Sequence, residues 1–279
     1  MPWRSVLFVP GTSRDRFPKA FAAGADAVVL DLEDGVDAAR KAEAREAVGA
    51  WLARPSSGSP VRLVRVNAVD SSFIADDLSW LRSIDGRYDG LVLPKVESPD
   101  QIHRIAAAAP SRRVIPLLET ARGILRASDI VPANARIPAV LFGAEDLTAQ
   151  LGIPRTVEGE ELVVARGQVV LAAASIGADP IDAVFVEIAN PDRLRQDAAR
   201  ARAAGFTGKM AIHPDQVPVI NDVFSPSADE VAAARRILEA AESASARGEG
   251  AFRLEGRMVD APVIRRAQRV LALTGHRRT

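Results

Sequence analysis

The chain has 279 residues, of which 48% are hydrophobic and 26% are charged, the usual balance for a globular protein large enough to bury a substantial core. Its 36 basic and 36 acidic residues give a formal net charge of zero, which argues against binding nucleic acid or another polyanion. Because cysteine is absent, disulfides, thiolate nucleophiles and cysteine zinc sites are excluded.

No apolar stretch reaches the roughly 18 residues of a membrane span. The start of the chain does not read as a secretory signal, because Pro10 and Gly11 interrupt a short apolar run. We therefore expect a cytoplasmic protein that does not act on membranes.

Eight short apolar runs alternate with helical patterns along the chain. They are apolar throughout, as expected for parallel strands that are buried on both faces. Eight such runs with helices between them favour a (β/α)8 barrel, the TIM-barrel fold, over an open sheet. The runs are Ser5–Val9, Ala27–Leu30, Val61–Val66, Gly90–Leu93, Val114–Leu118, Ala139–Phe142, Ala183–Val186 and Lys209–Ile212.

The predicted helices between these runs include Ala38–Ala53, Pro191–Ala204 and a long apolar-rich helix at Val157–Ile176. The last part of the chain departs from the alternation. Ser227 and Glu230 form a capping-box pattern at the start of a further helix, which we expect to end near Arg247. After two glycines come the segment Phe252–Val259 and a final helix, Pro262–Leu273. We therefore predict a barrel domain at residues 1–224 and a C-terminal helical extension at residues 225–279.

Two acids, Glu119 and Asp146, each follow directly on an apolar run. If these runs are neighbouring parallel strands, both carboxylates reach the rim of the barrel where such folds carry their active sites. Two anions about 4 Å apart would repel by roughly 4 kcal/mol at an effective dielectric near 20. A divalent cation removes this repulsion, and oxygen ligands with open positions suit Mg²⁺. Alternatively, each acid only caps the helix that follows it.

Further polar residues follow the other runs. Arg65, flanked by two valines, is expected to point into the barrel mouth, where it could bind a carboxylate, pair with Asp31 or Glu33, or do both. Lys95 could form a Schiff base, although a metal site makes one unnecessary. His213 is either an acid or base or a packed, hydrogen-bonded residue. The remaining members of this ring are Asp34, Asn67, Glu145 and Glu187.

Seven sequence blocks, in this order along nearly the whole chain, resemble those of the citrate lyase beta subunit. They are SVLFVPG, DLEDGVDAARKAEAR, RVNAVD, PLLETARGI, FGAEDLTAQLG, KMAIHPDQV and MVDAPVIRRA. The chain is likewise similar to malyl-CoA and citramalyl-CoA lyases, within the HpcH/HpaI aldolase superfamily of magnesium-dependent enzymes. Seven ordered blocks are far more specific than any single motif.

The resemblance implies roles for individual residues. Glu119 and Asp146 match the magnesium ligands, and Arg65 matches the arginine that binds the carboxylate of the oxo acid. Asp260 matches the catalytic acid or base, which the family contributes from a neighbouring subunit. Additional substrate-binding candidates are Glu33 and Asp34 in the same pocket, and Arg14, Arg16 and Lys19 near the phosphates of coenzyme A.

The implied reaction is the cleavage of a citryl-, malyl- or citramalyl-type thioester into an oxo acid and a short acyl thioester, or the reverse. The thioester is carried either by coenzyme A or by a carrier protein. A homo-oligomer, such as a trimer or hexamer, is expected because Asp260 has to reach another active site. Two alternatives remain open: a malate synthase or malyl-CoA thioesterase, and a subunit that is active only within a larger lyase complex.

Overall fold

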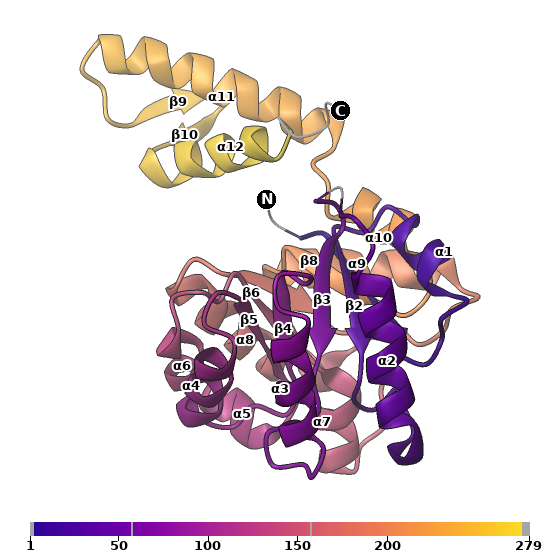
Figure 1. Ribbon diagram of the computed structural model, residues 1–279. Helices are drawn as coiled ribbons and strands as arrows, with labels where there is room; N and C mark the ends of the chain where they lie inside the picture. Colours follow the sequence, from indigo (N-terminus) through magenta and orange to yellow (C-terminus); the bar gives the residue numbers. More distant parts are fainter. Residues whose placement is uncertain (1–2, 57, 157, 275–279) are drawn as a thin grey trace. The chain divides into compact units, whose positions relative to one another are not determined.

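The computed structural model describes residues 3–56, 58–156 and 158–274. The described residues form two compact units, one within residues 3–224 and one at residues 225–274, and each is described by itself (Figure 1). No helix of the described residues combines the length and apolar character needed to cross a membrane.

The first unit is a closed barrel of eight parallel strands, in which each strand pairs with the next and β8 returns to β1. It is the (β/α)8 fold that the eight apolar runs predict. The strands are β1 (Ser5–Pro10), β2 (Ala27–Asp31), β3 (Val61–Arg65), β4 (Gly90–Leu93), β5 (Arg113–Leu118), β6 (Ala139–Phe142), β7 (Asp179–Asp182) and β8 (Gly208–Ala211).

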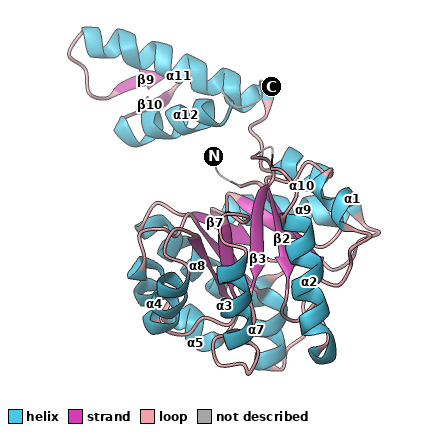
Figure 2. Cartoon of the chain, in the orientation of Figure 1, coloured by secondary structure: helices cyan, strands magenta, loops and turns pink. Residues whose placement is uncertain are grey.

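Helices lie outside the strands, as Figure 2 shows. They are α1 (Phe17–Phe21), α2 (Lys41–Leu52), α3 (Ile74–Ser83), α4 (Pro99–Ala108), α5 (Ala121–Leu125), α6 (Ala127–Ile130), α7 (Ala144–Leu151), α8 (Val163–Ser175), α9 (Pro191–Ala204) and α10 (Gln216–Val223). Short 3-10 turns stand at Ala38–Arg40, Val131–Ala133 and Glu160–Leu162.

Two hydrophobic clusters form the core of the barrel unit. The larger lies between the strands and the helices and includes Leu30, Val64 and Phe142. The smaller takes alternate residues of the strands, such as Val6 and Leu63, and fills the barrel interior. Because side chains alternate along each strand, the residue two positions beyond an interior residue also faces inward. This alternation directs Phe8 and Arg65 towards the barrel mouth.

The seventh strand was predicted in the wrong place. The apolar run Ala183–Val186 is not a strand, and β7 is the preceding segment Asp179–Asp182. Its aspartates and its proline do not suggest a buried strand. However, Asp182 is fully buried and its charge is compensated by Arg166 at 2.8 Å and by Lys209 at 2.6 Å. An ion-pair network from distant parts of the chain therefore permits a strand that local composition does not predict.

The long helix predicted from Val157 is also shorter than expected. Val157 itself lies outside the described residues, and α8 begins only at Val163, after the 3-10 turn. Gly159, just before that turn, has a φ of 71°, a left-handed conformation that an α-helix cannot contain.

The second unit consists of α11 (Ala228–Ala246), the antiparallel hairpin of β9 (Phe252–Leu254) and β10 (Arg257–Val259), and α12 (Ala261–Thr274). The predicted capping box is confirmed. The Glu230 N–H donates to Ser227 Oγ at 3.1 Å, and the Ser227 N–H donates to Glu230 Oε2 at 2.7 Å. Helices α11 and α12 pack against each other and against the hairpin.

Candidate active site

A pocket of about 330 Å³ opens at the carboxyl ends of the barrel strands. In this fold that end carries the active site. Its lining residues come from or closely follow seven of the eight strands, all except β4, and an apolar wall faces a set of charged groups. The apolar wall is formed by Phe8, Pro10, Leu117, Val184, Met210 and Ile212, and the charged groups are Arg16, Asp31, Asp34, Arg65, Glu119, Glu145 and Asp146.

Arg65 lies at the end of β3 and points into the pocket, while Val64 and Val66 beside it are buried in the outer cluster. Its guanidinium donates two hydrogen bonds to Asp31, from Nε and Nη2, each of 2.6 Å. Asp31 is held in turn by the backbone N–H groups of Glu33 and Gly35. The expected cross-strand salt bridge is therefore present, and it fixes the guanidinium.

The fixed guanidinium still has donors for a ligand. Its two hydrogen bonds to Asp31 use two of the five N–H donors of an arginine. Its Nη1 lies 3.0 Å from Glu33 Oε2. Burial lowers the pKa of Arg65, but the Asp31 and Glu33 carboxylates outweigh this effect and leave the pKa raised. Arg65 is thus a permanent, oriented cation that can bind a substrate carboxylate.

Glu119 follows β5 and is almost completely buried, with 2% of its surface exposed. Its Oε1 accepts a hydrogen bond of 2.9 Å from the backbone N–H of Lys95. Gly143, just after β6, packs so closely against it that a Cβ at this position would collide with the Glu119 side chain. The carboxylate therefore sits in a cradle made by backbone atoms of two neighbouring loops.

Asp146, in the first turn of α7, lines the same pocket and interacts electrostatically with Glu119. Burial and the nearby Asp146 raise the pKa of Glu119 well above its usual range, and Arg65 offsets this only in part. Across the described segments Asp146 makes no hydrogen bond or ion pair. Two carboxylates that repel each other in a pocket are chemically suited to a hard divalent cation.

The protein alone does not complete a metal coordination shell. In the described part of the chain, no group of three or more histidine, aspartate and glutamate side chains is arranged to hold a metal ion. Two carboxylates leave most of an octahedral shell to water or substrate oxygens, the arrangement that Mg²⁺ favours. Glu119 and Asp146 could therefore hold Mg²⁺ together with a chelating ligand.

Glu33 and Asp34, after β2, are tied to Lys95, whose Nζ contacts Glu33 and lies 3.0 Å from Asp34 Oδ2. Burial raises the pKa of Glu33, and Arg65 and Lys95 offset this only in part. For Asp34 the effect of Lys95 outweighs burial, so its pKa is lowered. The same two acids raise the pKa of Lys95 despite its partial burial. This keeps the lysine protonated and argues against a Schiff-base role.

The N-terminal cations lie in different places. Arg16 lines the pocket, whereas Arg14 contacts Glu46 at 3.2 Å and Lys19 lies 3.9 Å from Asp215. The two substrate-binding candidates Arg14 and Lys19 are thus exposed side chains that do not line the pocket.

Two other polar residues predicted near the strand ends, His213 and Glu187, make local interactions within loops. His213 accepts a hydrogen bond at Nδ1 from the N–H of Asp215, and 34% of its side chain is exposed. Glu187, which was expected just after a strand, lies five residues beyond the end of β7 and pairs with Arg193 at 2.5 Å.

Asp260 belongs to the second unit, where it stands before α12. Its Oδ1 accepts a hydrogen bond of 3.3 Å from the N–H of Val263, at the start of the helix. Its side chain is partly exposed. A free lone pair and this exposure are compatible with a role at a site, and its own unit contains none of the pocket residues.

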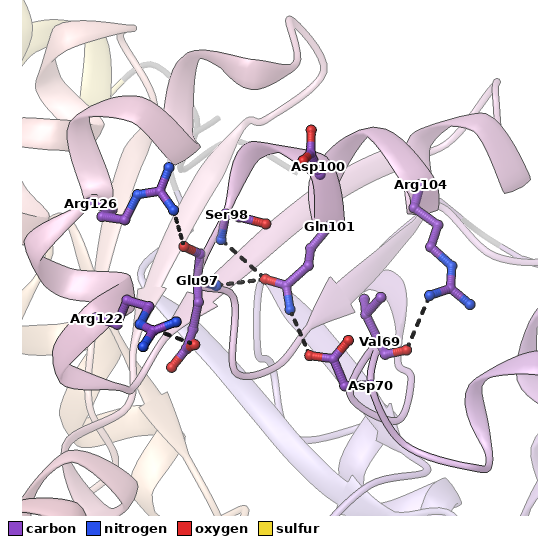
Figure 3. A pocket seen from close by; sticks show the side chains of 9 residues that line it. All are labelled: Val69, Asp70, Glu97, Ser98, Asp100, Gln101, Arg104, Arg122 and Arg126. Carbon is purple, nitrogen blue, oxygen red and sulfur yellow. Dashed lines mark hydrogen bonds and ion pairs between the residues drawn. The ribbon is translucent and has the colours of Figure 1, made fainter.

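A second hollow, of about 380 Å³, lies over the loops after β3 and β4 and the starts of α4 and α5 (Figure 3). Its charged groups largely satisfy one another. Gln101 donates to Asp70, and Arg122 lies 3.8 Å from the Glu97 carboxylate. Asp100 is almost fully exposed to solvent. With no buried, uncompensated charge, this hollow has the features of a structural loop contact and lacks those of a reactive site.

Residues 4–214 match the family model described as HpcH/HpaI aldolase/citrate lyase. The chain belongs to this family. It is 38% identical to a citrate lyase subunit beta-like protein of Deinococcus radiodurans, over 96% of both chains. It is 33% identical to the human mitochondrial citramalyl-CoA lyase, over 98% of this chain and 86% of the relative.

The fold is shared with a solved relative as well. The crystal structure of CitE from Mycobacterium tuberculosis, in complex with magnesium, acetoacetate and coenzyme A, has a TM-score of 0.84 and 38% identity, with 99% of each chain covered. The similarity therefore includes both the barrel and the C-terminal unit of this family member.

Sequence reasoning missed the groups that hold the site in place. Gly143 and the backbone N–H of Lys95 support Glu119, and neither carries a chemical signal of its own in the sequence. The apolar wall also escaped prediction, because Phe8 and Met210 look like ordinary strand residues until the barrel closes.

Proposed function

We propose that this protein is a magnesium-dependent carbon–carbon lyase that cleaves a citryl-, malyl- or citramalyl-type thioester into an oxo acid and a short acyl thioester, or catalyses the reverse reaction. The observation that carries the proposal is the buried Glu119 beside Asp146 in a pocket that also contains an oriented Arg65. The human relative is a citramalyl-CoA lyase, and the mycobacterial structure holds magnesium, acetoacetate and coenzyme A. Both support the same chemistry.

The residues of the pocket have different roles in this reaction. Glu119 and Asp146 would hold Mg²⁺, which supplies a Lewis acid for the oxygens of the oxo acid. Arg65 binds the carboxylate of the oxo acid and fixes its orientation, because Asp31 holds the guanidinium on its other side. The apolar wall with Phe8 and Leu117 keeps water away from the reacting carbon atoms.

In the cleavage direction a base removes the proton of the substrate hydroxyl group. The bond between the hydroxyl-bearing carbon and the carbon next to the thioester then breaks. Its electron pair passes to the thioester fragment as an enolate, which takes up a proton. We propose Asp260 of a neighbouring subunit as the acid or base, so that the enzyme works as a homo-oligomer.

A substrate screen tests this function. The purified protein is incubated with citryl-, malyl- and citramalyl-CoA, with Mg²⁺ or with EDTA, and the released oxo acid is measured. We expect magnesium-dependent cleavage of at least one thioester, and a parallel reaction with a carrier-linked thioester identifies the acyl carrier. Cleavage that is equally fast in EDTA would contradict the proposal, as would release of free thiol without an oxo acid, which would indicate a thioesterase.

A further inference from the structure

Lys95 has a backbone conformation that is unusual for its residue type. Its φ is 51°, in the left-handed region that side chains with a Cβ seldom adopt. Within residues 3–56, 58–156 and 158–274 only one other non-glycine residue, Glu255 in the β9–β10 hairpin, has a positive φ. Such conformations persist where the surrounding structure determines them, and they gather at functional sites.

The loop after Lys95 is held by a side chain of α4 and by one from the turn between α5 and α6, as Figure 3 shows. Gln101 Oε1 accepts hydrogen bonds from the N–H groups of Glu97 at 2.7 Å and Ser98 at 3.1 Å. Arg126 Nη1 donates to the Glu97 carbonyl at 3.3 Å. We call Gln101 and Arg126 the loop clamp. It fixes both polar groups of the Glu97 backbone, two residues from the strained position.

The residue with this left-handed conformation also contacts the pocket. Its backbone N–H donates to Glu119 Oε1 at 2.9 Å. This hydrogen bond occupies one oxygen, while Oε2 lies on the side of Gly143. The same residue sends its ammonium group to Glu33 and to Asp34. One lysine thus contacts three of the acids around the pocket through two different groups.

We propose that Lys95 is a positioning residue of the metal site: its backbone N–H orients Glu119 so that the second oxygen and Asp146 receive the cation, and its ammonium group holds Glu33 and Asp34 away from it. The loop clamp maintains the backbone conformation that this needs. The inference rests on the proposed function, because it assigns a task towards the same cation.

Substitutions at Lys95 distinguish the role of its backbone N–H from that of its ammonium group. Lys95→Val disfavours a positive φ, whereas Lys95→Asn tolerates it but lacks the charge, and Lys95→Arg keeps the charge. We expect Lys95→Val to weaken Mg²⁺ binding about 10–100-fold, the usual effect of removing a group that orients a metal ligand. Lys95→Asn keeps the backbone N–H for Glu119 but frees Glu33 and Asp34, so it should weaken Mg²⁺ binding clearly less than Lys95→Val does, and Lys95→Arg should preserve the affinity.

The controls use positions outside the pocket. Glu255→Val places the same residue at the other left-handed position, so it should lower the melting temperature without changing Mg²⁺ affinity. Should Lys95→Val fail to fold, the loop clamp provides a second route. Gln101→Met removes the acceptor for two backbone N–H groups and should weaken Mg²⁺ binding. Gln101→Glu combined with Asp70→Asn keeps this acceptor and still has a donor and an acceptor facing each other at 101 and 70, so this pair of changes should leave Mg²⁺ binding intact.

Isothermal titration with Mg²⁺, followed by kcat and KM for the thioester, decides between the outcomes. Equal Mg²⁺ affinity in the wild type and in folded Lys95→Val or Gln101→Met overturns this inference and leaves the proposed function intact. Equal loss in Lys95→Val and Lys95→Asn also overturns it, since backbone conformation would then be irrelevant. A wild-type protein that binds no Mg²⁺, either alone or with an oxo acid present, overturns the proposed function itself, and this inference with it.

Discussion

At Glu119, burial and a like charge act in the same direction. Both raise the pKa of this carboxyl group, so the metal-free protein contains an anion that its folded state disfavours at neutral pH. A bound cation stabilises the charged form of Glu119. Removing the cation should therefore destabilise the folded protein, whereas neutralising Glu119 should stabilise the metal-free protein.

We expect Glu119→Gln to unfold at a higher temperature than the wild type in EDTA and to be inactive. Mg²⁺ at about 100 times its Kd should stabilise the wild type by about 2.7 kcal/mol, or roughly 5–10 °C in Tm, but should not stabilise the variant. Differential scanning calorimetry with and without Mg²⁺ measures both effects. Glu145→Gln is the matched control, because Glu145 lines the same pocket but pairs with Arg155, and it should keep the Mg²⁺ response. A normal Mg²⁺ response in Glu119→Gln would exclude Glu119 as a ligand.

A substitution at Gly143 tests whether the loop that packs against Glu119 positions this carboxylate for the metal ion. A methyl group there would collide with the Glu119 side chain and displace it from its position beside Asp146. Gly143→Ala should therefore lower Mg²⁺ affinity about 10-fold or more, measured by isothermal titration. The control is Gly167→Ala in the middle of α8, where a Cβ meets no atom within 4 Å. That change should leave Mg²⁺ affinity unaltered and stabilise the helix by about 0.5–1 kcal/mol.

At the scale of the elements, a buried network joins β7, β8, α8 and α9. Lys209 is fully buried, and its Nζ lies 2.6 Å from an oxygen of Asp182 and 2.6 Å from an oxygen of Asp197. Arg166 completes the network from α8. Opposite charges held at these distances permit a polar strand to stand between apolar ones.

Removing one member of this network should be costly. Lys209→Met removes the only lysine of this network and leaves the buried Asp182 and Asp197 carboxylates to Arg166, with Arg200 at 3.5 Å from Asp197, so we expect the free energy of unfolding to fall by about 3–5 kcal/mol. Urea denaturation followed by circular dichroism measures this. Lys19→Met, at a cation with 66% of its side chain exposed, should change stability by no more than about 0.5 kcal/mol. Equal effects of the two variants would show that the buried network adds nothing to the stability of the fold.

The network also makes a pH-dependent contribution. Burial opposes ionisation of Asp197, but Lys209 and Arg166 outweigh it and lower its pKa to about 2. In the unfolded chain the pKa of this aspartate is near 4. At a pH above that value the lowered pKa of the folded state stabilises the fold by about 2–3 kcal/mol, and this stabilisation is lost as the pH falls towards 2. The stability difference between wild type and Asp197→Asn should therefore shrink from pH 6 to pH 3 in urea titrations. A difference that is constant with pH would contradict this assignment.

These elements also mark the limits of prediction from sequence. The rule that parallel barrels carry function at their strand ends led to Arg65, Glu119 and Asp146, which the structure brings into one pocket. The expectation that buried strands are apolar throughout misplaced β7, because the partners that neutralise Asp182 come from α8 and β8. The left-handed Lys95 was equally invisible, since a lysine carries no conformational signal of that kind.

At the scale of the whole molecule, the barrel unit contains an acid pair, an arginine and a pocket, and the extension contains the proposed acid or base. The proposal that Asp260 acts in a neighbouring subunit can be tested by mixing two inactive variants. Asp260→Ala keeps an intact barrel site, and Glu119→Ala keeps an intact extension. If subunits share sites and assort at random after joint refolding, about a quarter of the sites combine two intact halves.

We therefore expect the mixture to regain about a quarter of wild-type lyase activity, while each variant alone stays inactive. Asp260→Ala should still bind Mg²⁺, which separates loss of the acid or base from loss of the metal site. A mixture of Glu119→Ala and Asp146→Ala should regain nothing, because both changes damage the barrel half of every site. If the Asp260→Ala and Glu119→Ala mixture stays inactive although size-exclusion chromatography shows mixed oligomers, sharing between subunits is wrong, and Asp260 either acts on its own barrel or has no part in the reaction.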